Sequence, residues 1–142
     1  MRLDNTLLDS VSEVAKKALR QRTAFDLRTS ASENSQRMLN AIEPGTELPI
    51  HRHRNSSESC IVLRGSAEEI FFDDKGNITD RVEMRAGSDT VGVNIEKGRW
   101  HKIVSLEPGT VIFEAKDGAY MPISSEDTLT SVSYTHLTLP TN

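Results

Sequence analysis

Two histidines separated by a single residue constrain this chain more than any other feature of its sequence. They are His51 and His53, and Glu58 follows five residues after the second. Side chains at positions i and i+2 of an extended segment lie on the same face, so both imidazoles are expected to point to one place. The polar residues 54–57 form a short connection, after which a neighbouring strand can return the Glu58 carboxylate to that place.

These three side chains predict a metal site. Two neutral imidazoles and a carboxylate suit divalent Fe, Mn, Zn, Ni or Cu. A lone His-x-His pair is often only part of a solvated strand, but here a third ligand follows and Gly45 and Gly65 flank the segment. We therefore predict one divalent transition metal, and the identity among Fe, Mn, Zn and Ni stays open.

The spacing resembles the first motif of the cupin superfamily. That motif is Gly, five residues, His-x-His, three or four residues, Glu, six residues and Gly, and its fixed positions are filled by Gly45, His51, His53, Glu58 and Gly65. The resemblance implies an all-β domain, the cupin double-stranded β-helix or jelly-roll barrel, in which the two histidines and the glutamate bind metal.

A second cupin motif follows less closely. Its pattern is Gly, five residues, Pro-x-Gly, two residues, His, three residues and Asn, and Gly98 and His101 match its centre. The resemblance makes His101 the fourth ligand. Glu96 replaces the proline and Ser105 replaces the asparagine. The glycine nearest to the first position of the motif is Gly92. These departures concern the shape of a turn and leave the histidine in position. On a strand, His101 should face inward and lie beside the strand that carries Glu58.

A narrower resemblance, to the WbuC-type cupin metalloproteins, covers roughly residues 5–127. It implies a metal-binding domain that is often encoded with surface-polysaccharide biosynthesis genes and has no assigned reaction. The family's usual Trp-Ala-Pro segment is absent where the C-terminal residues begin. The matching segments are Ser35–Ala41, Phe72–Asp74, Trp100-His101 and Phe113–Tyr120.

Hydrophobic spacing predicts a helix followed by short strands. Leu8, Val11, Ala15 and Leu19 recur at helical spacing within about residues 4–20, behind a cap at Asp4, Asn5 or Thr6. One short strand is expected between residues 21 and 35. Alternating residues bounded by Gly and Pro turns predict further strands, for about eight or nine in all, at residues 35–42, 59–64, 67–72, 78–84, 91–95, 101–106 and 111–116.

Two further patterns concern turns and charge. The sequence Glu-Pro-Gly-Thr occurs at residues 43–46 and again at 107–110, which we interpret as similar corners in two halves of one barrel. The pair Glu68-Glu69 is expected to form a solvated edge.

Composition sets the broad class. A chain of 142 residues is expected to form one domain, and a net charge of −4 with mixed signs argues against nucleic-acid binding. One cysteine excludes an internal disulfide framework, and no segment approaches the length of a membrane span. We expect a cytoplasmic protein that binds a small molecule, with no nucleic-acid or membrane partner. A homodimer stays open.

The C-terminal residues differ from the rest. Residues 128–142 contain no Asp, Glu, Lys or Arg, and they hold five threonines. We interpret residues 1–127 as a single cupin domain and residues 128–142 as a tail, unstructured or artefactual. His136 lies in that tail, so we exclude it from the metal site.

Four residues are candidates for contact with a substrate. Glu114 lies between apolar neighbours, and inside a barrel its carboxylate would be a candidate acid or base. Lys116 shares its strand face, and a surface ion pair of the two is the alternative. Arg37 could bind an anionic group, or form an outward salt bridge. Tyr120 could line the mouth of the barrel, or simply pack. Cys60 is expected on the same side as Glu58, as a buried structural residue.

The leading functional hypothesis is a metal-dependent enzyme that acts on a small, sugar-derived or carboxylate-bearing molecule. Metal Lewis-acid chemistry of the isomerase or epimerase type would suit this ligand set. The alternatives are a non-catalytic metal-dependent binding protein and an Fe(II) oxygenase. The fold does not decide among these three, so the position of Glu114 relative to the metal is the most direct discriminator.

Overall fold

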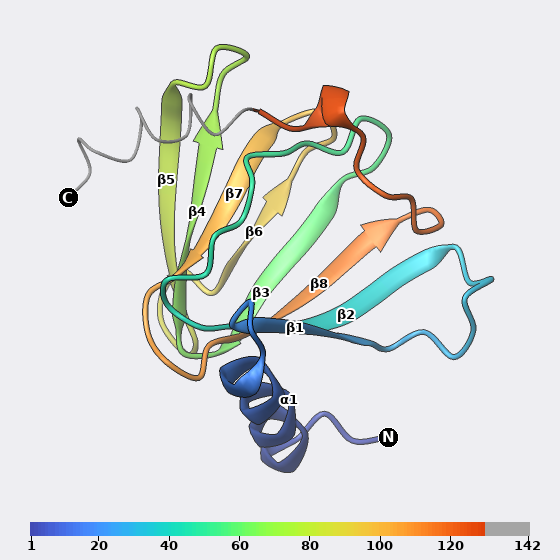
Figure 1. Ribbon diagram of the computed structural model, residues 1–142, viewed down its shortest axis with the longest axis vertical. Coiled ribbons are helices and arrows are strands. Elements are labelled where there is room, and N and C mark those ends of the chain that lie inside the picture. The colour runs from blue at the N-terminus through green and yellow to red at the C-terminus, as the bar shows by residue number, and fades with distance from the viewer. Residues whose placement is uncertain (130–142) are drawn as a thin grey trace.

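The computed structural model describes residues 1–129, which form one N-terminal helix and eight strands in two antiparallel sheets (Figure 1). The larger sheet has the strand order β1-β2-β8-β3-β6, and the smaller has the order β5-β4-β7. The elements are α1 (Asn5–Lys17), β1 (Arg22–Asp26), β2 (Ser35–Ile42), β3 (Glu58–Arg64), β4 (Ser66–Phe72), β5 (Ile78–Arg85), β6 (Gly92–Ile95), β7 (Trp100–Ser105), β8 (Val111–Asp117) and a short 3-10 helix (Ser125–Asp127).

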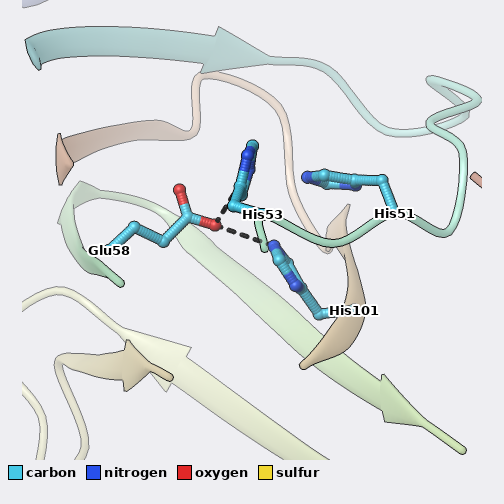
Figure 2. Close-up of side chains that lie close together, drawn as sticks. All are labelled: His51, His53, Glu58 and His101. Carbon is cyan, nitrogen blue, oxygen red and sulfur yellow. Dashed lines mark hydrogen bonds and ion pairs between the residues drawn. The ribbon is translucent and has the colours of Figure 1, made fainter. Parts of the chain in front are cut away.

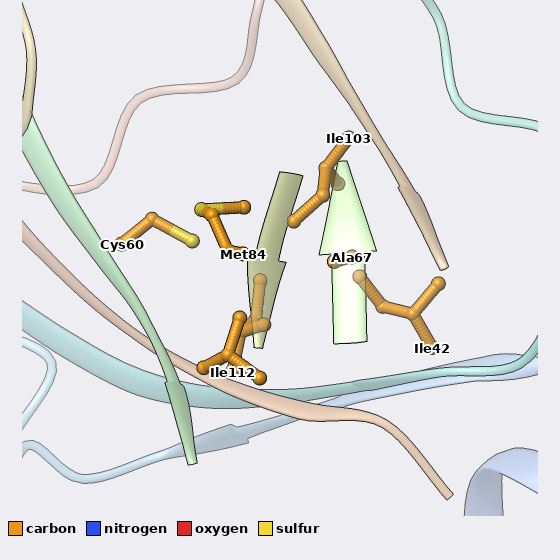
Figure 3. Packing of buried hydrophobic residues seen from close by; sticks show 7 residues of the cluster. Ile42, Cys60, Ala67, Met84, Ile103 and Ile112 are labelled. Atoms are coloured by element: carbon orange, nitrogen blue, oxygen red, sulfur yellow. The ribbon is translucent and has the colours of Figure 1, made fainter. Parts of the chain in front are cut away.

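The two sheets face each other and enclose the core. Side chains from both sheets meet in one buried cluster (Figure 3), which consists of Ile42, Cys60, Val62, Ala67, Met84, Ile103 and Ile112. The predicted fold class, a jelly-roll barrel with an N-terminal helix, is confirmed. Each predicted strand is observed within one residue at either end, and β1 supplies the short strand that was expected before residue 35.

The N-terminal helix packs against the outer face of the larger sheet. Its Leu8, Val11 and Ala15 are buried together with Leu39 of β2 and Val111 of β8. These helix residues recur at three- and four-residue spacing, so a single face of α1 covers the sheet. The helix therefore closes one side of the barrel and leaves the interior to the strands.

The ends of α1 have clear local causes. The Asp4 carboxylate accepts a hydrogen bond from the backbone N–H of Leu7 at 3.1 Å, which makes it the N-cap. The helix stops at Lys17, three residues short of the predicted end. The backbone N–H of Gln21, whose φ is +58°, donates to the carbonyl of Ala18 and turns the chain away. Leu19 consequently lies fully exposed, and its predicted place in the apolar stripe was wrong.

The two Glu-Pro-Gly-Thr corners adopt matching local structures. In each, the threonine hydroxyl donates to the glutamate carbonyl, over 2.6 Å from Thr46 to Glu43 and 2.8 Å from Thr110 to Glu107. The corners also contact each other, because the backbone N–H of Gly109 donates to the Glu43 carboxylate over 2.8 Å. This contact joins the connections at the end of the barrel near α1.

The pair Glu68-Glu69 does not form a solvated edge, contrary to expectation. The strand β4 that carries it lies in the middle of the smaller sheet, between β5 and β7. Alternation then turns Glu68 outward, where it pairs with Arg81 over 2.9 Å, and turns Glu69 into the barrel, where it is 3% exposed.

The C-terminal end of the described chain packs alongside the histidine segment. The backbone N–H of Leu129 donates to the carbonyl of Ile50 over 2.9 Å, and Thr128 forms a β-bridge with His51. The packed chain therefore runs two residues past the expected domain end at Asp127. Residues 130–142, with His136, lie outside the described residues. Within residues 1–129, no helix combines the length and apolar character needed to cross a membrane.

Candidate metal centre

Four side chains converge at one end of the barrel interior, and all four were predicted as ligands. One nitrogen from each of His51, His53 and His101 and one oxygen from Glu58 lie within 4.8 Å of one another. Figure 2 shows His53 and His101 facing the Glu58 carboxylate, with the ring of His51 beside those two imidazoles. The ring centroids of His51 and His101 are 4.4 Å apart, and those of His51 and His53 are 5.1 Å apart.

Both sheets contribute to this cluster. Glu58 is the first residue of β3 in the larger sheet, whereas His101 lies on β7 in the smaller sheet. Their side chains therefore meet across the barrel, and the expectation that β7 lies beside β3 was wrong. The His-x-His segment is also not a full strand. Only His51 pairs with its neighbours, through β-bridges to His101 and Thr128.

The turn of the second motif is tied directly to the first. Gly98 has a φ of +81°, which favours glycine, and its backbone N–H donates to the carbonyl of His53 over 2.7 Å. The backbones of His51 and His101 exchange two further hydrogen bonds, of 3.0 and 2.9 Å. These bonds hold the three histidines in register although Glu96 replaces the usual proline.

Backbone carbonyls orient two of the imidazoles. Nδ1 of His51 lies 3.1 Å from the carbonyl oxygen of Pro49, and Nδ1 of His101 lies 2.8 Å from that of Arg99. A carbonyl oxygen can only accept, so Nδ1 carries the proton in both rings. Each Nε2 is then the nitrogen available to a metal ion, as in many metal sites where a second hydrogen bond fixes the histidine tautomer.

Glu58 and His101 form a close ion pair. His101 Nε2 lies 2.7 Å from Glu58 Oε1, and both residues are at most 5% exposed. Burial alone would raise the pKa of Glu58, but the hydrogen bond and charge of His101, with Lys116 and His53, lower it to about 2. Burial likewise opposes the charge on His101, but Glu58 and Glu69 raise its pKa above the ordinary value.

The other two histidines are neutral at physiological pH. Burial and the neighbouring His101 lower the pKa of His51 to about 3. Burial and the charge of Lys116 lower that of His53 to about 4. Neutral imidazoles are the form that binds metal, so these two candidate ligands can bind an ion without first losing a proton.

The donor set fits a divalent transition metal. Three imidazole nitrogens and one carboxylate oxygen are borderline ligands, and such ions bind them at about 2.0–2.2 Å. Three nitrogens and one oxygen also leave positions for a further ligand on a five- or six-coordinate ion. Glu58 and His101 share a proton across their 2.7 Å contact, and a bound cation would take the place of that proton.

A small cavity of about 120 Å³ opens beside this cluster. Two larger hollows lie next to it, and Ile123 borders all three. The cavity is lined by the four cluster residues and by Glu69, Ile103, Glu114, Lys116 and Ile123.

Two of the four candidate substrate residues line this cavity. Glu114 is half-buried there, and burial followed by the charge of Glu58 raises its pKa to about 7. Lys116 places its Nζ 3.8 Å from Glu58 Oε2. Glu114 pairs in register with Cys60, and Lys116 pairs with Glu58, so both side chains follow the inward face of β8.

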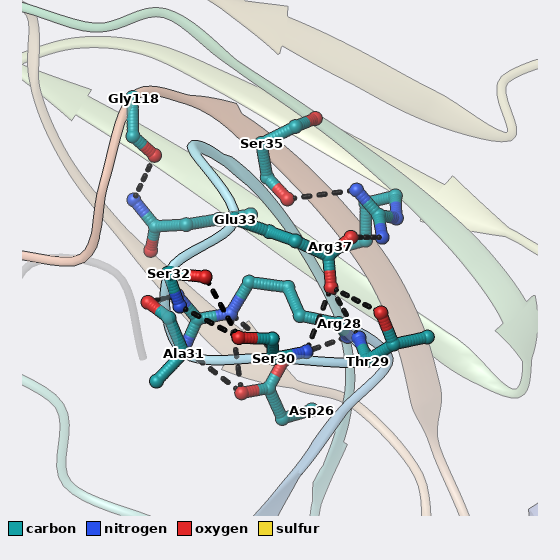
Figure 4. Close-up of polar contacts among 11 residues, drawn as sticks. Asp26, Arg28, Thr29, Ser30, Ala31, Ser32, Glu33, Ser35, Arg37 and Gly118 are labelled. Atoms are coloured by element: carbon teal, nitrogen blue, oxygen red, sulfur yellow. Dashed lines mark hydrogen bonds and ion pairs between the residues drawn. The ribbon is translucent and has the colours of Figure 1, made fainter.

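The other two candidates lie away from the cavity. Arg37 shares the face of β2 that carries Leu39, which packs against α1. Its guanidinium bonds to Glu33 and to the carbonyl of Ser35, each at 2.9 Å, within the polar loop drawn in Figure 4. Tyr120 is 62% exposed on the segment after β8 and lines none of the three hollows.

Cys60 is buried on the same side as Glu58, as expected, and belongs to the core cluster. Burial, and then the negative charges of Glu114, Glu69 and Glu58, raise the pKa of its thiol well above the ordinary value, so it is unreactive. Glu69 was missed by sequence reasoning. The only available signal was the alternation of the predicted strand at residues 67–72, which turns one of the two adjacent glutamates inward.

Solved structures share this fold. One mutant of Bacillus subtilis oxalate decarboxylase OxdC aligns at 22% identity with a TM-score of 0.57, over 76% of this chain and 28% of that chain. An oxalate oxidase aligns at 16% identity with a TM-score of 0.61, over 85% of this chain and 67% of that chain. KdgF from Halomonas sp. aligns at 13% identity with a TM-score of 0.56, over 70% of this chain and 82% of that chain. The chain thus spans little more than a quarter of the oxalate decarboxylase.

These neighbours establish the cupin fold for this chain. No curated protein matches it. One family model, described as a domain of unknown function, matches residues 3–84, which include His51, His53 and Glu58 and make up more than half of the chain. The chain therefore belongs to the DUF6016 domain family.

Proposed function

We propose that this protein is a metal-dependent enzyme that moves a proton between carbon atoms of a small sugar-derived or carboxylate-bearing molecule. Such isomerase- or epimerase-type chemistry needs a cation beside the substrate carbonyl and a separate acid or base. The observation that carries the proposal is that Glu114 lines the same cavity as the four converging residues.

His51, His53, Glu58 and His101 would hold the metal, a single divalent ion such as Fe, Mn, Zn or Ni. When bound, the ion would supply Lewis-acid polarisation of a substrate carbonyl. The protein holds two of these rings in fixed orientations, because the backbone carbonyls of Pro49 and Arg99 accept hydrogen bonds from His51 and His101.

Glu114 would act as the acid and base. A carboxyl with a pKa of about 7 is divided between its two protonation states at neutral pH, which suits both removal and return of a proton. Its carboxylate would take the proton from the carbon next to the carbonyl. The C–H electron pair becomes a carbon–carbon double bond as the carbonyl electrons move onto oxygen. In epimerisation, the proton returns to the other face of the same carbon and the original carbonyl is restored. In isomerisation, the proton returns to the former carbonyl carbon, the hydroxyl proton of the first carbon passes to the former carbonyl oxygen, and the first carbon becomes the new carbonyl.

The positive charge of Lys116 favours a substrate that carries an anionic group. Its ammonium lies beside the cavity and 3.8 Å from Glu58, so it can balance one added negative charge. Among the fold neighbours, the oxalate oxidase was solved in complex with the substrate analogue glycolate, a small hydroxy acid. We extend that substrate size to this chain as part of the proposal. Membership of the WbuC-type cupins and a role in surface-polysaccharide biosynthesis belong to the proposal too, and rest on the sequence resemblance.

The test is proton exchange in D₂O. Metal-loaded protein is incubated with short aldoses, ketoses, uronic acids and 2-hydroxy acids, and the loss of carbon-bound protons is followed by NMR. We expect exchange or conversion of at least one compound. Glu114→Gln should abolish it while metal content is unchanged, and the exposed control Glu126→Gln should leave it intact.

Other outcomes separate the alternatives. Protection against thermal unfolding by a compound that undergoes no exchange or conversion would indicate a binding protein without turnover. Oxygen consumption that requires Fe(II) and a substrate would indicate an oxygenase. Failure to bind any of Fe, Mn, Ni or Zn would remove the basis of the proposal.

A further inference from the structure

One buried carboxyl at this site has no role in the chemistry above. Glu69 is 3% exposed, lines the cavity, and its Oε2 has no hydrogen-bond partner within residues 1–129. Buried polar atoms are almost always hydrogen-bonded, because an unpartnered one costs free energy on folding. A carboxyl retained in this state is therefore expected to find its partner in a bound molecule.

Strand register fixes the depth of Glu69 in the barrel. On the smaller sheet, Phe71 pairs with His101 and Glu69 pairs with Ile103, so Glu69 lies one inward position beyond the histidine. One inward position corresponds to two residues, or roughly 7 Å along a strand. Since Ile103 belongs to the core cluster, Glu69 lies between the metal centre and the hydrophobic core.

Glu114 occupies the same depth on the opposite sheet. Lys116 pairs with Glu58, and Glu114 pairs with Cys60, which is one inward position beyond Glu58. Glu69 and Glu114 thus face one cavity from opposite sheets, at its floor. The four ligand residues form the level above.

The chemistry of these two carboxyls favours neutral, hydroxyl-bearing ligand groups. Burial raises the pKa of Glu69 to about 8, with His101 opposing the rise and Glu58 and Glu114 adding to it, so Glu69 is largely protonated at neutral pH. Glu114, with a pKa of about 7, is near half protonation. Carboxyls in these states both donate and accept hydrogen bonds, and a hydroxyl group does the same. A carboxylate on the ligand would instead remain at the level of the metal and Lys116.

We propose that Glu69 and Glu114 form a binding position for the hydroxyl groups of a short polyhydroxy acid or sugar whose other end lies at the metal centre. This inference rests on the proposed function and narrows its substrate class. The small cavity admits a short chain of this kind, with its anionic or carbonyl end at the metal level and its hydroxyls at the floor.

The test compares glycerate with propionate, which has the same chain length and no hydroxyl groups. Binding of each to Mn(II)-loaded protein is measured by calorimetry. We expect glycerate to bind at least tenfold more tightly than propionate, about the effect of one well-made hydrogen bond. In Glu69→Leu this preference should disappear, with Mn(II) content and propionate affinity unchanged.

A second measurement uses stability. Since Glu69 has an unpartnered buried oxygen when no ligand is bound, Glu69→Leu should raise the melting temperature of the ligand-free protein by several degrees. Glu68→Leu is the matched control, because Glu68 is its neighbour on β4 but faces outward toward Arg81. That control should keep the preference for glycerate.

The outcomes distinguish the two proposals. A wild type that binds no Mn(II), Fe, Ni or Zn overturns the proposed function and this inference with it. A metal-loaded wild type without preference for glycerate, or a preference that survives in Glu69→Leu, overturns the inference alone. If Glu69→Leu fails to fold, Glu69→Met, which matches the glutamate in length, replaces it. A lower melting temperature, or failure of both variants to fold, assigns Glu69 a structural role and overturns the inference.

Discussion

The carboxylate of Glu58 and the imidazole of His101 meet across the barrel, with 2.7 Å between Oε1 and Nε2. Each comes from a different sheet, so this contact joins the two sheets at the candidate metal centre. Nδ1 of His101 already donates to a backbone carbonyl, and the short contact at Nε2 holds a second proton. A metal ion at Nε2 must displace that proton.

Metal affinity should therefore depend on pH. The raised pKa of His101 keeps its proton in place near neutrality, whereas His51 and His53, with pKa values of about 3 and 4, are already neutral. We expect release of about one proton per metal and an affinity that falls by about tenfold for each pH unit below the His101 pKa. Calorimetry of Mn(II) binding in buffers of different ionisation enthalpy measures both. An affinity that does not change between pH 6 and 8 would contradict this prediction.

Removal of His101 should weaken the site without unfolding the protein. His101→Ala leaves three ligands and is expected to lower metal affinity by at least about tenfold. The fold should survive, because the core cluster beneath the site is made by other side chains. Equilibrium dialysis and circular dichroism measure the two effects. His136→Ala is the control, since we exclude His136 from the site, and it should bind metal like the parent. Equal affinity in His101→Ala would show that His101 is not a ligand.

The metal-free protein should lose stability as the pH rises above about 6.5. The pKa values of Glu69 and Glu114 are raised to about 8 and 7, so the folded state holds protons that the unfolded state releases. The raised pKa of His101 acts with the same sign above its ordinary value of about 6.5. His51 and His53 act with the opposite sign, but only below about pH 6.5.

Thermal unfolding with a chelator at pH 6.5, 7.25 and 8 tests this. The melting temperature should decrease along the series, and the decrease should be smaller in Glu69→Leu, which lacks one of the carboxyls. A melting temperature that increases over this range would mean that the raised pKa values are absent from the folded protein.

The sequence identified the strands and the convergence of the candidate ligands because both follow local rules. Alternation and Gly or Pro turns marked each strand, and the spacing of His51, His53 and Glu58 was sufficient to predict that they meet. The arrangement of the strands in the two sheets was harder to predict from the sequence. Glu58 and His101 lie in opposite sheets, which depends on how the strands pair and on no local pattern.

Which face of a strand points inward was a second limit. Both faces of β2 carry apolar residues, and only the packing of α1 on Leu39 and Ala41 turns Arg37 away from the cavity. The same limit applied to Glu68 and Glu69. Adjacent glutamates look alike in a sequence. Glu69 is buried and Glu68 faces outward because β4 lies in the centre of its sheet.

Deletion of residues 130–142 should leave folding and metal content unchanged. This segment has no charged residues and no strand alternation in its sequence, and we propose that it is not part of the domain. A longer deletion, of residues 128–142, should lower the melting temperature, because it removes the Leu129 bond to Ile50 and the Thr128 bridge to His51. Thermal unfolding and metal analysis of both truncations test the boundary. A decrease of more than a few degrees in the shorter deletion would show that the domain continues beyond Leu129.

The two glycines that bound the first motif offer a matched pair for the last prediction. Gly45 and Gly65 have φ values of +87° and +81°, so alanine is strained to a similar degree at either position. They differ in the space around them. A Cβ at Gly65 would lie 2.9 Å from the backbone Cα of Thr110 and closer still to its hydroxyl, whereas a Cβ at Gly45 would meet nothing within 4 Å.

Thr110 cannot move away easily. It is fully buried, and its hydroxyl donates to the carbonyl of Ser66 over 3.1 Å or to that of Glu107 over 2.8 Å. Gly45→Ala should therefore cost about 1–2 kcal/mol, the cost of the left-handed backbone alone. Gly65→Ala should cost about 1–3 kcal/mol more, because overpacking adds to the same strain. Urea unfolding of the two variants measures the difference. Equal losses of stability would show that backbone conformation alone, and not the close approach of Thr110, requires glycine at the end of the motif.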